Sequence, residues 1–278
     1  MSTRPPTKSH PITSFILKLT GKDKIAPSHD RDWAPDQQIL PYAKFHPNQD
    51  TIDIFNIRNC SYQTVTDYTV AHYDKAYKLS ELTSLDFVLE PFGHIGAAHL
   101  LVTFGFKNGT YLAISIEIRK RRNTKFSHYK VFTEPHELMY VIADESDVIK
   151  LRTNYRKDTV YLYPVETTVE HMQKLFIHLL TRANAIKEAP EFYNPITNNC
   201  TTHLVDYVHD VTDKNIYTDY RLFFTRFSDT LAKELGLIAS DMTIKEARKR
   251  YRITEIAQQS DDSKNFSKQI RPHLYTAE

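Results

Sequence analysis

The chain contains 278 residues, of which 41% are hydrophobic and 25% are charged, and its formal net charge is +2. This length is enough to bury a substantial core, as one large domain or as one domain with extensions. A net charge this small, without a concentrated basic surface, argues against a nucleic-acid-binding protein. The densest basic runs, 119–122 and 245–252, are interpreted as solvated faces, with contact to anionic lipid as the functional alternative.

Nothing in the sequence predicts a membrane span or an export signal. No stretch approaches the ~20 consecutive apolar residues that cross a bilayer. The short apolar run 12–19 lacks the length and the cleavage pattern of a signal peptide. We therefore expect the chain as given to be soluble.

The two cysteines, Cys60 and Cys200, limit the metal and redox chemistry of the chain. Cys200 and His203 alone are too few ligands for a zinc site, and no other metal-ligand cluster stands out. We expect neither a metal nor a cofactor. In an oxidising compartment the two cysteines could instead form one disulfide.

The pattern of the chain predicts three regions. Residues 1–30 are rich in Pro, Lys, Ser and Thr and are typical of an irregular leader, which Trp33 is expected to pin to the body. The body spans residues 31–257, and the polar residues 258–278 form a loose tail. Apolar alternation predicts strands within the body at 51–68, 79–89, 139–151 and 159–165.

A hairpin over residues 97–119 gives the most informative local prediction. Its two alternating strands are joined by Lys107-Asn108-Gly109, a strong turn signal. A two-residue loop would mix polar and apolar side chains on each face, whereas a three-residue loop makes one face wholly apolar. The pairs in that register are Leu100 with Ile116, Val102 with Ile114, and Phe104 with Leu112.

The same register places His99 opposite Glu117, at a Cβ separation of about 5 Å. A histidine facing a carboxylate is a base with an orienting partner, although the same pair also occurs as a purely structural hydrogen bond. Ser115 lies on this face as polar lining or as an ordinary strand residue. His94, on the entering loop, is the nearest competitor of His99, and His203 is interpreted as a wall or surface residue.

Helices are predicted in the second half of the chain. Thr167 and Glu170 form a capping box, which opens a helix with one apolar face. The members of that face are Val169, Met172, Leu175, Phe176, Leu179, Leu180, Ala183 and Ile186. Further helices are expected at 220–236 and at 243–257, the latter capped by Ser240 or Asp241. Phe223, Phe224 and Phe227 of the 220–236 helix form a core or rim stripe.

Cys200 is the candidate nucleophile. Pro190 and Pro195 hold the preceding segment out of a helix, and Asn198 and Asn199 are good N-cap residues. Cys200 would then lie in the first helical turn, where the helix dipole favours a thiolate. Asn199 and the Cys200 backbone N–H could form an oxyanion hole. A buried, inert cysteine is the competing interpretation, to which spacing alone gives equal weight.

Five short segments together resemble one bacterial family. They are Arg31-Asp32-Trp33-Ala34-Pro35-Asp36, Ala98-His99, Ser115-Ile116-Glu117-Ile118-Arg119, Asn198-Asn199-Cys200-Thr201-Thr202 and Asn265-Phe266-Ser267-Lys268-Gln269-Ile270-Arg271. The family is named after the periplasmic N-terminal domain of the Lnb-type lipoprotein N-acyltransferases. The resemblance covers roughly residues 30–271, with the motifs in the same order.

The resemblance implies an α+β fold of the papain-like kind, permuted as in NlpC and lecithin:retinol acyltransferase proteins. An antiparallel sheet packs against helices there, and the cysteine lies at a helix N-terminus. By motif, Cys200 is the nucleophile, His99 the base and Glu117 the orienting group, with Asn199 and Ser115 in support. The family implies a periplasmic or membrane-associated location, but this chain departs from the membrane-bound members in lacking a transmembrane helix.

The expected function is a thiol-dependent acyltransferase that acts through an acyl-Cys thioester. It would move a lipid acyl chain to an amine such as the N-terminus of a lipoprotein. Its partners are an acyl lipid or lipoprotein, with peripheral membrane contact and no nucleic acid. One alternative is a papain-like cysteine peptidase or amidase, and another is a non-catalytic module that binds lipid or a protein partner. An acyl chain requires a long apolar groove, whereas a peptide requires partners for its backbone.

Overall fold

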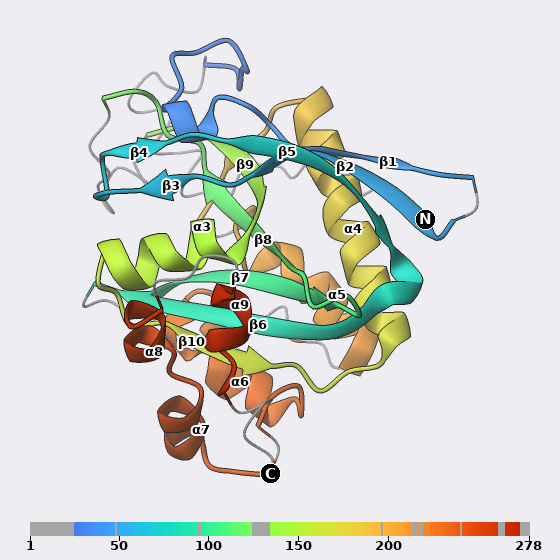
Figure 1. Cartoon of the computed structure of the whole chain (residues 1–278), viewed down its shortest axis with the longest axis vertical. Helices are drawn as coiled ribbons and strands as arrows, with labels where there is room; N and C mark the ends of the chain where they lie inside the picture. The colour runs from blue at the N-terminus through green and yellow to red at the C-terminus, as the bar shows by residue number, and fades with distance from the viewer. Residues whose placement is uncertain are drawn as a thin grey trace.

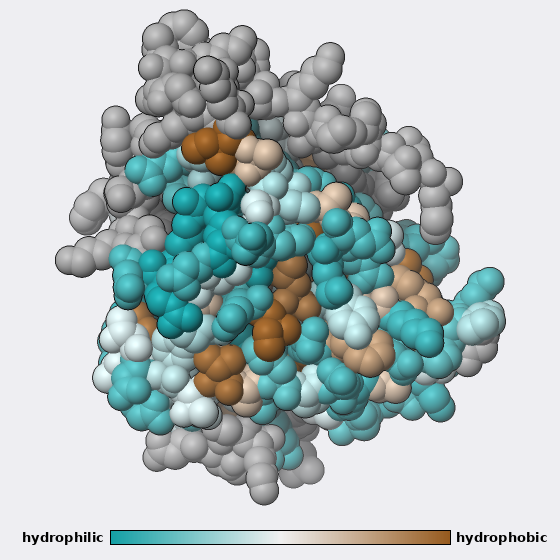
Figure 2. All heavy atoms as spheres, turned by 90° about the horizontal axis from the view of Figure 1, so that it is seen from above, coloured by the Kyte–Doolittle hydropathy of each residue, from teal (hydrophilic) through white to brown (hydrophobic). Residues whose placement is uncertain are grey.

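The computed structural model describes residues 25–47, 49–93, 96–123, 134–195, 197–212, 216, 219–239, 241–260 and 265–272. His94 lies outside the described residues. The fold is α+β, as predicted, with a largely antiparallel sheet between helices on both of its faces (Figure 1). The face of the molecule in Figure 2 is mainly hydrophilic where described residues are visible, and its hydrophobic residues form small separate areas.

One sheet contains nine of the strands, in the order β1-β2-β9-β8-β7-β6-β10, with β5 paired to β2 and β11 paired to β9. These strands are β1 Tyr42–Phe45, β2 Thr51–Arg58, β5 His72–Lys78, β6 Leu82–Phe92, β7 Ala97–Phe106, β8 Tyr111–Ile118, β9 His136–Ala143, β10 Tyr161–Pro164 and β11 Phe192–Tyr193. A small second sheet pairs β3 Ser61–Tyr62 with β4 Tyr68–Thr69. Only the short β2–β9 contact is parallel among the described pairs.

The helices divide between the two faces of the sheet. They are α3 Glu145–Lys150, α4 Val169–Glu188, α5 Thr202–Thr212, α6 Ser228–Glu234, α7 Ile244–Arg250, α8 Thr254–Gln258 and α9 Phe266–Gln269. Side chains of α4 and α5 pack with Leu100, Val102 and Phe104 of β7 in one core. Side chains of α3, α8 and α9 pack with Leu101 in a second core on the opposite face. Alternate residues of β7 therefore contact different layers of helices.

The predicted hairpin is confirmed over most of its length. Val102 pairs with Ile114 and Phe104 with Leu112, and Gly109 has the positive φ of +78° that the three-residue loop requires. The pairing of β7 with β8 ends, however, at Leu101 and Ser115, so the predicted Leu100–Ile116 pair does not form. The two strands separate beyond this point, next to His99.

The predicted strand 139–151 is wrong in its second half. The strand ends at Ala143, and α3 begins at Glu145 with Glu145 and Asp147 in its first turn. Carboxylates are favourable at a helix N-terminus. Both acids are also buried against arginines, Glu145 against Arg271 and Asp147 against Arg58. A π-helical turn, Leu151–Tyr155, follows α3.

The predicted helix 220–236 is mostly irregular. It consists of two 3-10 turns, Tyr220–Leu222 and Thr225–Phe227, followed by α6. The Thr225 hydroxyl donates to the Ala98 carbonyl (2.8 Å) and accepts from the Ala98 N–H (2.7 Å), which fixes this segment against the start of β7. The predicted helix 243–257 is interrupted as well, because Arg252 forms a bridge with Tyr161 between α7 and α8.

Helix caps differ from the predictions by one or a few residues. The N-cap of α4 is Thr168, whose hydroxyl accepts from the His171 N–H, while the Thr167 hydroxyl contacts that of Tyr207. Thr243, rather than Ser240 or Asp241, caps α7. The apolar face of α4 is confirmed, except that Val169 is 47% exposed.

Both ends of the body are fixed by arginines. Trp33 is 4% exposed, and the Arg119 guanidinium carbon lies 4.2 Å from the centre of the Trp33 ring, so the chain is held to the body at this residue. Residues 1–24 of the predicted leader lie outside the described residues. The tail is not loose throughout, because residues 265–272 pack on the sheet. Arg271 is completely buried and pairs with Asp86 and Glu145, which lie on β6 and α3.

Candidate active site

A line of hydrogen bonds connects His99 to Glu117 across β7 and β8. His99 Nε2 lies 2.7 Å from Ser115 Oγ, and Ser115 Oγ lies 2.9 Å from Glu117 Oε1. The direct separation between His99 Nε2 and Glu117 Oε1 is 3.8 Å. Ser115 thus links the histidine to the carboxylate that the hairpin register placed opposite it.

The direction of these hydrogen bonds determines the His99 tautomer. An ionised carboxylate only accepts, so the Ser115 hydroxyl donates its proton to Glu117. The Ser115 oxygen must then accept from a proton on His99 Nε2. Nδ1 of a neutral His99 consequently carries the lone pair, and no described residue hydrogen-bonds to it. The imidazole ring, whose side chain is 18% exposed, presents its basic nitrogen away from Glu117.

Arg152 holds the carboxylates on either side of His99. Its Nη2 donates to Glu117 Oε1 at 3.0 Å and its Nε donates to Glu90 Oε2 at 2.7 Å. Glu90 is the cross-strand neighbour of His99 on β6. A third bond, from Nη1 to the Val148 carbonyl, fixes the guanidinium within its own helical segment. The arginine and Glu90 are both 3% exposed, so the pair is well shielded from water.

This environment keeps His99 neutral and Glu117 ionised. Burial and the Arg152 charge lower the pKa of His99 to about 4, against partial opposition from Glu117 and Glu90. Burial alone would raise the pKa of Glu117, but the charge of Arg152, together with those of Arg58 and Lys120 and the interaction with His99, outweighs burial and holds that pKa well below its usual range. A neutral imidazole with a bare nitrogen can accept a proton at physiological pH.

Asn199 creates the turn on which Cys200 lies. The Asn199 side-chain oxygen accepts from the backbone N–H groups of Thr201 (2.8 Å) and Thr202 (3.0 Å), as an N-cap does. Its amide nitrogen donates to the Pro195 carbonyl at 2.7 Å. Cys200 therefore directly follows the capping residue, and α5 begins two residues later, at Thr202. The Asn199 side chain is engaged in this capping, whereas the Cys200 N–H donates to no other residue in the described part of the chain.

Cys200 is 5% exposed and packs in the core that contains Leu100. Burial raises the pKa of its thiol, and the backbone N–H groups of Leu100 and Thr201 offset only part of that rise. The expectation that the helix terminus produces a thiolate is therefore wrong for this state. In an antiparallel pair, the N–H groups of every second residue point to the same neighbouring strand. The Phe106 N–H donates to the Thr110 carbonyl beside β8, so every second N–H of β7 counted back from Phe106 points to the β8 side. The Leu100 N–H belongs to this set, and it points to Cys200 where the strands separate.

The structure brings Cys200 beside β7 at the residue after His99, without joining the two side chains. No hydrogen bond connects Cys200 to His99 in the described part of the chain. The sulfur lies 4.0 Å from Thr201 Oγ1. Both cysteines are free thiols, so the Cys60–Cys200 disulfide is not formed. His203 Nε2 donates to Asn198 Oδ1 at 2.8 Å, and its buried ring packs edge-on against Tyr140.

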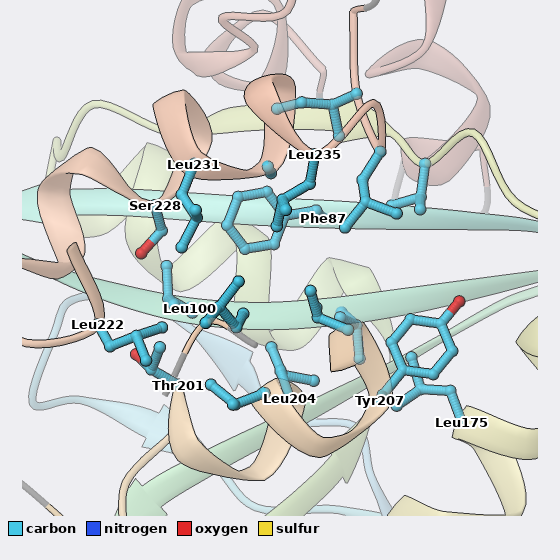
Figure 3. A pocket seen from close by; sticks show the side chains of 18 of the residues that line it. Phe87, Leu100, Leu175, Thr201, Leu204, Tyr207, Leu222, Ser228, Leu231 and Leu235 are labelled. Atoms are coloured by element: carbon cyan, nitrogen blue, oxygen red, sulfur yellow. The ribbon is translucent and has the colours of Figure 1, made fainter. Parts of the chain in front are cut away.

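A pocket opens between the sheet and α4, α5 and α6, and Thr201 next to Cys200 is part of its wall (Figure 3). It encloses about 660 Å³, including the part open to solvent. Almost all of its lining side chains are apolar. They include Phe87, Leu100, Leu175, Leu204, Leu231 and Leu235, from β6, β7 and the three helices.

The sequence model of one protein family, described as the Lnb N-terminal periplasmic domain, matches residues 68–230. The chain belongs to the Lnb N-terminal domain family. The match extends over more than half of the 278 residues and includes His99, Glu117 and Cys200. The family resemblance expected from the sequence is thus confirmed. Comparisons with curated proteins and with solved structures gave no match.

Within the described residues of this Lnb-family domain, every helix is too short or too polar to cross a membrane. Arg152 and Glu90 are the site residues that the sequence analysis missed. A signal for them existed, because Glu90, His99 and Glu117 occupy neighbouring positions on three adjacent strands. Two carboxylates flanking a buried histidine require a cation nearby. The pocket lining had no comparable signal, since its side chains come from distant segments.

Proposed function

We propose that this chain is a thiol-dependent acyltransferase that forms a thioester on Cys200, in a papain-like arrangement with His99 as base. The observation that carries this proposal is the apolar pocket whose wall includes Thr201, the residue after Cys200. A lipid acyl chain fits such a lining, whereas a peptide would find few partners for its backbone amides. The pocket therefore favours an acyl substrate over the peptidase or amidase alternative.

The first half-reaction begins with transfer of the Cys200 S–H proton to His99 Nδ1. This step requires the thiol to come within hydrogen-bond reach of the imidazole, a distance that often tightens only when substrate binds. The sulfur then attacks the carbonyl carbon of an acyl ester, and the Cys200 N–H stabilises the oxyanion. When the ester C–O bond breaks, His99 returns the proton to the leaving alcohol and a thioester remains.

In the second half-reaction an amine attacks the thioester carbonyl carbon. His99 accepts a proton from the amine, the C–S bond breaks, and the proton passes to the Cys200 sulfur. The products are an amide and the free thiol. Arg152 and Glu117 contribute through the His99 tautomer, because they hold the Ser115 hydroxyl in the direction that leaves Nδ1 basic. The N-terminus of a lipoprotein is the acceptor that the resemblance to the Lnb-type lipoprotein N-acyltransferases implies, and the periplasm, which the family description names, is the corresponding location.

The test uses a diacylated lipopeptide and a fluorescent acyl ester, with intact-protein mass spectrometry as the readout. Wild type is expected to gain one acyl group, which hydroxylamine removes as expected for a thioester. Cys200→Ala should gain none, while Cys60→Ala, the matched control on the other buried thiol, should behave as wild type. If neither donor leaves an acyl group on Cys200, the acyltransferase proposal fails.

A non-catalytic lipid-binding module is the second candidate. The raised pKa of the Cys200 thiol and the missing hydrogen bond to His99 favour it over a thiol poised for attack. The same experiment separates the two functions. A binding module would take up the fluorescent acyl ester reversibly, equally in wild type and Cys200→Ala, and would show no mass increase in either.

Contact with a membrane surface is part of the proposal. Four aromatic side chains between α5 and α6 are strongly exposed: Tyr220 at 61%, Phe223 at 52%, Phe224 at 46% and Phe227 at 41%. Leu222 and Ser228 of the same segment line the pocket. Exposed aromatic residues are favourable at membrane interfaces. Changing the three phenylalanines to serine should weaken co-sedimentation with phospholipid vesicles, whereas Phe45→Ser, an exposed phenylalanine on β1, should not.

A further inference from the structure

Ser228 is a buried hydroxyl without a partner in the wall of the apolar pocket. The residue is 7% exposed, and its Oγ makes no hydrogen bond although it is shielded from solvent. Ser228 is the first residue of α6, but the N-cap position belongs to Phe227 and no side chain caps this helix. The hydroxyl thus serves no capping function. A buried hydroxyl without a hydrogen-bond partner lowers the stability of the fold, so its presence calls for a role other than stabilising the fold.

The other hydroxyl groups of the pocket wall are already engaged. Tyr207 Oη lies 3.1 Å from Thr167 Oγ1, and Thr201 Oγ1 contacts the Cys200 sulfur at 4.0 Å. Figure 3 shows Ser228, Thr201 and Leu222 on one side of the pocket and Tyr207 and Leu175 on the other. The free hydroxyl is therefore on the same side as the residue that follows Cys200, and the opposite side is apolar apart from the engaged tyrosine.

We propose that Ser228 donates a hydrogen bond to a carbonyl oxygen of an acyl ester bound in this pocket. The ligand is then oriented, with its ester group beside Ser228 and Thr201 and its hydrocarbon chain extending toward Leu175 and Tyr207. This inference rests on the proposed function for the choice of an acyl ester as ligand. It adds a positioning residue that selects for an oxygen atom at one end of the chain, which hydrophobic contacts alone cannot do.

The experiment measures binding without turnover, in the Cys200→Ala protein. Methyl octanoate and decane, which have equal numbers of chain atoms, displace an environment-sensitive fluorescent dye from the pocket. Loss of one hydrogen bond in Ser228→Ala should weaken methyl octanoate binding roughly 3- to 10-fold and leave decane binding unchanged. Ser228→Thr, which keeps the hydroxyl, should retain the preference for the ester. Thr230→Ala on the same helix is the control, because Thr230 does not line the pocket.

Thermal unfolding of the ligand-free proteins gives a second readout, in which the substitution that weakens ester binding should not lower the stability of the protein. Because the Ser228 hydroxyl has no partner, Ser228→Ala should unfold at the same or a higher temperature than its parent. A lower melting temperature would mean that the hydroxyl serves the fold, and it would overturn the inference. Equal weakening of ester and decane binding, or no binding of either, would overturn it too. Thioester formation on Cys200 in the wild type is measured separately and tests the proposed function itself.

Discussion

Glu117→Gln tests the electrostatic design of the site most directly. The Glu117 Oε1 atom accepts from both Ser115 and Arg152. In the variant, the amide oxygen must therefore take the place of Oε1, because the amide nitrogen would meet two donors there. The Ser115 hydroxyl keeps its direction and His99 keeps its proton on Nε2. The substitution removes the negative charge and leaves the tautomer unchanged.

The size of the effect follows from the distance between the two charges. When His99 is protonated during the reaction, its Nε2 lies 3.8 Å from Glu117 Oε1. At an effective dielectric constant of about 20, this attraction is about 4 kcal/mol. Its loss corresponds to an upper limit of about three powers of ten in rate. We expect acylation to slow by roughly 100- to 1000-fold, whereas Ser115→Ala, which loses a neutral hydrogen bond, should slow it about 10-fold.

Single-turnover acylation of Cys200, quenched and followed by mass spectrometry, measures the rates. Nuclear magnetic resonance titration of His99 in the Cys200→Ala protein measures its pKa, which Glu117 raises and which should therefore fall further in Glu117→Gln. Asp53→Asn is the matched control, because Asp53 faces His46 at 2.7 Å on a different strand pair. Acylation within threefold of wild type, or a higher pKa of His99 in Glu117→Gln, would refute the reasoning.

Three other measurements test separate features. The pKa of His99 is about 4 in the folded protein, against 6.5 for the free side chain, so the acylation rate should fall on the acid side near pH 4. The unfolded chain binds this proton at a higher pH than the folded protein does. Stability in urea should therefore also decrease as the pH falls from about 6.5 to 4. Iodoacetamide should label Cys200 more slowly than a free thiol at pH 7, since burial raises its pKa, and faster labelling would contradict that shift. Arg271→Met should lower the free energy of unfolding by about 3–5 kcal/mol, because two buried carboxylates lose their cation, whereas the exposed Arg252→Met should cost under about 1 kcal/mol.

The sequence was informative where the chemistry is local. Alternation in the hairpin predicted the register that brings His99 to Ser115 and Glu117, because one slip would expose the apolar face. The cap before Cys200 was predictable for the same reason, since the Asn199 side chain acts on its own next residues. Both features depend on neighbours within about twenty positions of the chain.

Features that depend on distant segments were not predictable in this way. Arg152 reaches Glu90 and Glu117 from a π-helical turn, and no periodic pattern indicates such a turn. The 220–236 segment has helical periodicity, but bonds between Thr225 and Ala98 hold it in short turns. The raised pKa of Cys200 likewise reflects burial by the sheet, which the helix dipole argument did not include.

The position of Arg271 near the end of the chain should also affect when the protein can finish folding during its synthesis. Asp86 leaves the ribosome 185 residues before the arginine that neutralises it, and Glu145 leaves 126 residues before it. Until then, burying these carboxylates would be unfavourable, so a nascent chain that already contains His99 and Cys200 should stay partly open. A fragment limited to the family-matched residues 68–230 would remain in that unfinished condition permanently. Expression of this domain for any experiment should therefore extend at least through residue 272.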